Sequence, residues 1–137
     1  MSSCVVETLP MVGHSFKDIV AWQKAHQFVV RVYEACRDFP EWEKFGLTSQ
    51  FTRAAVSIPA NIAEGYKRLS KQDKLRFMNY SQGSLEECRY YIILAKDLNY
   101  IDNATFQSLD TSIEETSKLL NSYIRGIDNF SAQEQMS

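Results

Sequence analysis

Apolar residues recur at alternating spacings of three and four through most of the chain, and this periodicity restricts the fold more than any other feature. Such a spacing places side chains along one face of an α-helix. The 137 residues include only 5 glycines and 3 prolines. A β-sandwich or barrel needs a turn residue about every 8 to 12 positions. The sequence therefore predicts an all-α protein.

The first two periodic segments are separated by a short connection at residues 41–46. Ser15 and Asp18 resemble a capping box that opens the first helix, and Pro40 ends it. We expect the buried stripe of this helix to be Ile19, Trp22, His26, Val29, Tyr33 and Cys36, with His26 as a hydrogen-bonded core residue. The second segment, residues 47–66, keeps its register through Pro59, which predicts one kinked helix rather than two.

The third and fourth segments begin with their own capping signals. Ser70 and Asp73 open the longest helix, which we expect to end near Leu98 with Asn99 as a left-handed cap. This helix has two apolar stripes, so we expect it to be buried on two sides, the second side facing another subunit. The second stripe is Phe77, Tyr80, Ser84, Tyr91, Leu94 and Leu98, with Glu87 as its one charged interruption. Asp102 caps a fourth helix that ends near Ile127.

Short connections make successive helices antiparallel, so the expected fold is an up-down-up-down antiparallel four-helix bundle, kinked in its second helix at Pro59. We expect the bundle to occupy residues 15–127, between a flexible leader at 1–14 and a disordered tail at 128–137. No apolar stretch is long enough to span a membrane, and a secretory signal is missing. We therefore expect no membrane partner and a cytoplasmic location.

The sequence contains no recognisable catalytic or metal-binding pattern. Di-iron bundles use Glu-x-x-His pairs on two helices, and this chain has no such pair. Its two histidines, His14 and His26, are too scattered for an imidazole-based metal site, and its three cysteines lack paired C-x-x-C spacing. Glycine-rich phosphate loops and nucleophile motifs are also missing. We expect no enzyme, no metal and no cofactor.

Charge is distributed unevenly, although the net charge is only −2. Residues 53–76 hold six basic and two acidic residues, a net of +4, whereas residues 97–137 carry a net of −5. The basic residues are Arg53, Lys67, Arg68, Lys71, Lys74 and Arg76. Such a run is either a solvated surface or a phosphate-binding rim for nucleic acid. Repetition of the rim around a ring of subunits would strengthen its field.

Four stretches are specific enough to suggest a family: WQKA at 22–25, FGLTSQ at 45–50, RAAVSIPANIAEG at 53–65 and GSLEE at 83–87. They resemble the bacterial four-helix-bundle family associated with intervening sequences in 23S rRNA genes, also labelled S23. The match covers residues 15 to 125 in order, and its most distinctive part is 47–65. The chain departs from the family at Thr52, where relatives often have a second basic residue, and at Asn99, where they commonly have glycine.

The resemblance implies a homopentamer and extends to accessory variability determinant proteins of diversity-generating retroelements, which bind nucleic acid and a reverse transcriptase. We therefore expect a non-enzymatic oligomeric adaptor that binds structured RNA or DNA through the basic end of the bundle. The alternative is a homo-oligomeric protein-interaction scaffold without nucleic-acid binding. Candidate contacts between helices or subunits are Ser57, Pro59, Asn61, Glu64, Phe77, Tyr80 and Tyr91.

Overall fold

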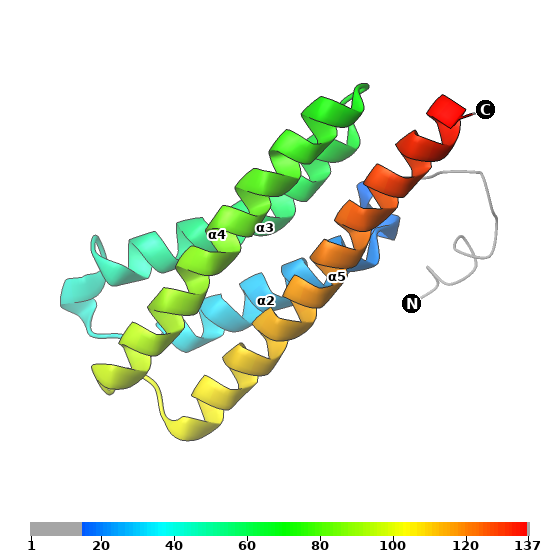
Figure 1. Cartoon of the computed structure of the whole chain (residues 1–137). Coiled ribbons are helices and arrows are strands. Elements are labelled where there is room, and N and C mark those ends of the chain that lie inside the picture. Colours follow the sequence, from blue (N-terminus) through cyan, green and yellow to red (C-terminus); the bar gives the residue numbers. More distant parts are fainter. Residues whose placement is uncertain (1–14, 137) are drawn as a thin grey trace, which may run out of the picture.

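A computed structural model of the chain describes residues 15–136, with side chains described through residue 129, and this part is helical apart from its connections (Figure 1). The leader predicted at 1–14 lies outside the described residues. The elements in order are the 3-10 helix η1 (Phe16–Asp18), α2 (Val20–Cys36), the 3-10 helix η2 (Glu41–Glu43), α3 (Leu47–Tyr66), α4 (Lys71–Asp97) and α5 (Asn103–Met136). None of the described helices is long and apolar enough to cross a membrane.

The four long helices form a closed ring of neighbours (Figure 1). α2 packs against α3 and α5, and α4 packs against the same two helices, while the diagonal pairs make no comparable contacts within residues 15–136. Short connections join consecutive helices, so each runs antiparallel to the one before it. The predicted up-down-up-down bundle is confirmed.

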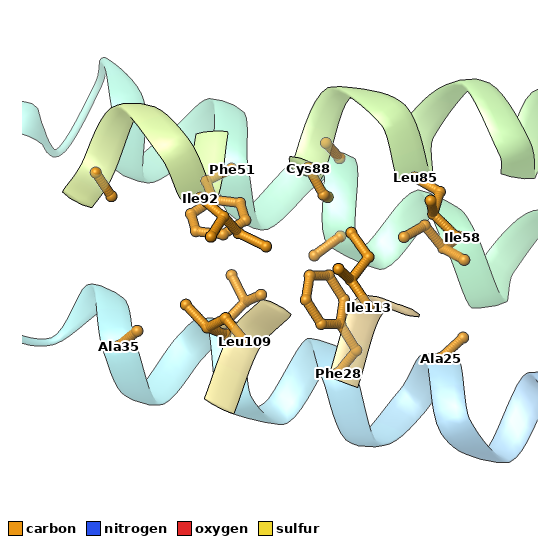
Figure 2. Packing of buried hydrophobic residues seen from close by; sticks show 14 of the residues in the cluster. Ala25, Phe28, Ala35, Phe51, Ile58, Leu85, Cys88, Ile92, Leu109 and Ile113 are labelled. Carbon is orange, nitrogen blue, oxygen red and sulfur yellow. The ribbon is translucent and has the colours of Figure 1, made fainter. Parts of the chain in front are cut away.

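The core lies along the axis between the four helices (Figure 2). Each long helix contributes a large side chain that is at most 1% exposed: Phe28 from α2, Phe51 from α3, Ile92 from α4 and Ile113 from α5. Full burial of one such side chain stabilises the fold by about 1.5–3 kcal/mol. In α3, α4 and α5 the buried apolar residues repeat at the helical spacing that the sequence shows.

The first helix differs from the prediction in both its start and its buried face. Ser15 and Asp18 do form the capping box, but it caps the start of η1, and α2 begins only at Val20. The buried residues of α2 are Ala21, Ala25, Phe28, Val32 and Ala35. Tyr33 is 50% exposed. The alanine stripe faces the core because small side chains let neighbouring helices approach closely.

His26 is exposed and does not belong to the core, which contradicts our expectation. Its ring stacks on Trp22 with the centroids 5.3 Å apart. Trp22 is only partly buried and packs against the edge of the core. The predicted stripe is thus a second apolar stripe beside the buried one, rotated toward the surface.

α3 continues through Pro59 as a single helix, as expected. A proline has no N–H to donate to the carbonyl four residues earlier, and its ring crowds that carbonyl. Pro59 is buried, and beside it the carbonyl oxygen of Ile58 accepts a hydrogen bond from the buried Ser81 hydroxyl of α4 at 2.9 Å. This bond ties α3 to α4 beside the buried proline.

The connection between α4 and α5 follows the prediction, whereas the end of α5 does not. Asn99 has a φ of 63°, the left-handed conformation expected of the cap, and Asp102 Oδ1 accepts the Thr105 N–H at 2.8 Å. α5 does not end near Ile127 but continues to Met136, so helix replaces the predicted disordered tail over residues 128–136. This stretch contains no glycine or proline, and extension of an existing helix gains one hydrogen bond per residue.

Candidate functional site

The structure gathers five of the six predicted basic residues where α3 turns into α4, at what we call the basic end. They are Lys67, Arg68, Lys71, Lys74 and Arg76. Arg53 lies on α3, 14 residues before Lys67, which places it about 21 Å away along a helix that rises 1.5 Å per residue. Arg53 is therefore not part of the cluster.

Three of the five basic side chains at this end are paired with carboxylates. The pairs are Arg68 with Glu64, Lys71 with Asp128 at 3.4 Å and Arg76 with Asp73 at 3.2 Å. All six side chains are more than a third exposed, so each pair stabilises the fold by no more than about 1 kcal/mol. Five basic and three acidic groups leave a net charge of +2, half of the +4 that residues 53–76 carry.

Aromatic rings hold two of the arginines in place. The guanidinium carbons of Arg68 and Arg76 lie 4.6 Å and 4.9 Å from the centroid of the Phe77 ring. Tyr80 packs edge-on against the same ring, with the centroids 5.5 Å apart. Arg68 Nε is buried and has no hydrogen-bond partner among the described residues. Arginine on an aromatic face gains a cation–π attraction of about 0.5–1 kcal/mol at an exposed site.

The two lysines without carboxylate partners differ in their surroundings. Lys74 Nζ donates to the backbone oxygen of Tyr66 at 2.9 Å and lies 5.7 Å from that ring centroid. Burial lowers the pKa of Lys74, because desolvation disfavours the charged ammonium. Lys67 is exposed and makes no ion pair with any described residue. Lys67 is thus the side chain most available to an external phosphate.

The polar residues of the distinctive α3 motif are occupied within the helix. Asn61 Nδ2 donates to the Ser57 backbone oxygen at 2.8 Å and to Ser57 Oγ at 2.9 Å. Glu64 pairs with Arg68, and Pro59 is buried. Within one chain, the polar side chains of Asn61 and Glu64 thus bond to residues four positions away in the sequence, not to another long helix.

The second apolar stripe of α4 is only partly covered within one chain. Phe77, Tyr91 and Leu94 are half-buried, whereas Tyr80 is 48% and Leu98 45% exposed. Tyr90 and Ile93, beside this stripe, are 57% and 51% exposed. We call these seven residues the α4 face. The exposed Glu87 lies between Tyr80 and Tyr90. Exposed apolar patches on a soluble protein commonly mark an interaction site.

Sequence reasoning missed three other exposed apolar features. On α2, Val30 and Tyr33 are 45% and 50% exposed and form, with His26, what we call the α2 face. The connection between α2 and α3 exposes Trp42 and Phe45, and Leu69 is exposed at the tip of the α3–α4 turn. Only the connection between α2 and α3 offered a sequence signal, because Trp42 and Phe45 stand in a short segment between Pro40 and Gly46.

The described residues offer little for covalent or metal chemistry. Burial raises the pKa of the Cys36 thiol to about 12 and raises that of Cys88 as well, so both thiols stay protonated at neutral pH. Residues 15–129 contain no group of three or more histidine, cysteine, aspartate or glutamate side chains placed to hold a metal. A shallow hollow of about 280 Å³ between α2 and α5 is lined by Arg31, Glu34 and Ser108, among others, and Arg31 there donates to Ser108 Oγ at 2.9 Å.

A comparison with models of protein families matches residues 17–122 to the 23S rRNA-intervening sequence proteins. The match spans most of the chain. The chain belongs to this family. A solved relative is a protein of unknown function from the S23 ribosomal protein family of Bacteroides thetaiotaomicron VPI-5482. It is 28% identical, with a TM-score of 0.68 over 76% of this chain and 97% of that one. A comparison with curated proteins finds no match.

The matched region holds the five basic residues, the α2 face and the α4 face. It ends six residues before Asp128. The acidic partner of Lys71 thus comes from a segment outside the family match, on a stretch of α5 where the sequence predicted no helix.

Proposed function

We propose that this protein is a non-enzymatic adaptor that assembles into a ring of identical bundles. The α4 face supports this assembly, because it leaves four large apolar or aromatic residues 45–57% exposed in a single chain. Aromatic side chains with exposed rings are the commonest anchors of protein interfaces. A second copy packed on this face would bury them.

A ring requires two different faces on each subunit, because a face that pairs with itself closes a dimer. The α2 face and the α4 face satisfy this condition, since they lie on helices that are diagonal to each other in the bundle. Contact between the α4 face of one copy and the α2 face of the next would repeat around an axis. The resemblance implies five copies.

Sedimentation velocity of the full chain at micromolar concentration tests the assembly. We expect an oligomer whose mass is several times the 15.8 kDa of one chain. Tyr90→Asp on the α4 face and Tyr33→Asp on the α2 face should each shift it toward the monomer. Val20→Asp is the matched control, because Val20 is 52% exposed but lies on another side of α2. A wild-type monomer at high micromolar concentration would refute the proposal.

Nucleic-acid binding at the basic end is the second candidate, supported by the residual charge of +2 and by Lys67, which has no ion-pair partner among the described residues. One copy carries a weak field, but a ring places every copy of this end on one side and multiplies the charge. Binding to a protein such as a reverse transcriptase stays a prediction from the resemblance. The scaffold without nucleic acid is the competing hypothesis.

Fluorescence anisotropy of labelled structured RNA and duplex DNA, at low and physiological salt, separates these candidates. Nucleic-acid binding predicts an affinity that falls steeply with salt and that decreases on Lys67→Glu. Arg53→Glu makes the same charge change about 21 Å away along α3 and should have a smaller effect. An absence of binding at low salt would favour the scaffold without nucleic acid. Equal effects of both substitutions would refute binding at the basic end.

A further inference from the structure

The connection between α2 and α3 presents two aromatic side chains to solvent at the end of the bundle opposite the basic end. Trp42 is 75% exposed and Phe45 is 89% exposed. Two hydrogen bonds fix this connection to the bundle: the Glu43 carboxylate accepts from the Tyr100 hydroxyl and from the Leu47 N–H, both at 2.8 Å. We call residues 41–46 the aromatic loop. Rigid aromatic side chains lose little conformational entropy on binding, which suits them as anchors.

The turn between α3 and α4 presents one apolar side chain in the same manner. Leu69 is 99% exposed and lies within residues 67–71, which we call the basic turn. The turn is braced on both sides of Leu69: the Arg68 N–H donates to the Gly65 oxygen at 3.1 Å, and Ser70 Oγ accepts the Asp73 N–H at 3.1 Å. The 20 residues of α3 separate the basic turn from the aromatic loop, a distance of about 30 Å.

The two ends of the bundle carry opposite charge. Residues 37–46 and 96–103, which surround the aromatic loop, contain five acidic and three basic residues, a net of −2. The basic end has a net of +2 once Asp128 is included. Each end therefore combines exposed apolar side chains with a charge that complements the other end.

We propose that the basic turn of one copy docks onto the aromatic loop of a second copy, end to end, with Leu69 packed against Trp42 and Phe45. The contact joins two different surfaces, so a pair of copies still has one free basic turn and one free aromatic loop. The same contact can therefore repeat along the bundle axis. It is distinct from the lateral contact between the α2 and α4 faces. In a ring whose subunits all point the same way, several end-to-end contacts would form together and strengthen one another.

Photo-crosslinking of the full chain tests the contact directly. A benzophenone amino acid at position 69 should form intermolecular cross-links to the peptide that contains residues 41–46, identified by mass spectrometry. The yield should fall at high salt, because the complementary charges are screened. Cross-links confined to other segments, or none at all, would overturn the proposal.

A mixing experiment establishes that the contact joins different surfaces. Trp42→Ala with Phe45→Ala removes the anchors of the aromatic loop, and Leu69→Asp disables the basic turn. These side chains are exposed, so both variants should keep the wild-type helical circular dichroism. Each variant alone should lose end-to-end association by about 30-fold or more, as expected for the loss of hot-spot residues. An equimolar mixture should regain one contact, from the intact turn of one variant to the intact loop of the other.

If the aromatic loops paired with each other instead, Leu69→Asp would leave association unchanged and mixing would restore nothing. Either result would overturn the proposal. Tyr33→Asp separates this contact from the lateral one, because it lies on the α2 face. It should abolish the lateral assembly and still permit the cross-link from position 69. If the cross-link from position 69 were lost in Tyr33→Asp but kept in the variant with Trp42→Ala and Phe45→Ala, the cross-link would belong to the lateral contact.

Discussion

Replacement of Gly65 by alanine tests how closely α3 and α4 pack beside the basic end. A Cβ atom built there would lie 2.6 Å from Met78 Cε and 3.0 Å from Phe77 Cβ. The end of the methionine side chain can move aside. Phe77 Cβ is attached directly to the backbone of α4, so relief of that contact requires the two helices to separate by a few tenths of an ångström.

Two opposing effects determine the size of the change. Alanine is favoured over glycine in a helix interior by about 0.8–1.0 kcal/mol. An extra methyl group in a well-packed core costs about 1–3 kcal/mol. Since the contact with Phe77 cannot be relieved by a side-chain rotation alone, we expect Gly65→Ala to lower the free energy of unfolding by about 1 kcal/mol.

Gly83→Ala is the matched control, because Gly83 is also helical but a Cβ there would meet nothing within 4 Å. It should raise the free energy of unfolding by about 0.5–1 kcal/mol. Urea unfolding followed by far-ultraviolet circular dichroism, at one fixed protein concentration, measures both changes. Opposite signs would support close packing at Gly65. If Gly65→Ala stabilised the protein as much as Gly83→Ala does, the packing argument would be wrong.

Three further predictions concern single groups. Ser81→Ala removes a buried hydroxyl that donates to the Ile58 carbonyl and should cost about 0.5–1.5 kcal/mol in urea unfolding; no measurable change would contradict this role for the bond. The pKa of Glu114 is lowered by its hydrogen bond with Arg89, so this pair should stabilise the fold above the ordinary glutamate pKa and lose that effect as the pH falls through the lowered value. Glu114→Gln should flatten that part of the stability profile, and an unchanged profile would refute the assignment. Because burial raises the pKa of Cys36 and Cys88, both thiols should resist alkylation at pH 8 until the protein unfolds, as measured by peptide mass spectrometry; rapid labelling of either in the folded protein would contradict their burial.

The helical class and the order of the helices follow from the amino-acid pattern alone. The core stripes of α3 and α5 were predictable because apolar residues repeat there at helical spacing and no competing stripe is as regular. α4 carries two apolar stripes, and one of them, which includes Leu85 and Ile92, faces the core. Capping residues such as Ser70 and Asp102 act within a few positions of the chain, so their hydrogen bonds follow from the local sequence. The left-handed Asn99 was predictable for the same reason.

Which apolar stripe of α2 faces the core depends on packing against α3 and α5, because Ala25 and Trp22 lie on adjacent stripes of that helix. Packing between helices also sets the charge of the basic end. Arg53 and Lys67 share one basic segment but are separated by most of a helix, whereas Asp128 is distant in the sequence and lies 3.4 Å from Lys71. Electrostatic interactions depend on distances in space, and local periodicity carries no information about which segments of a bundle meet.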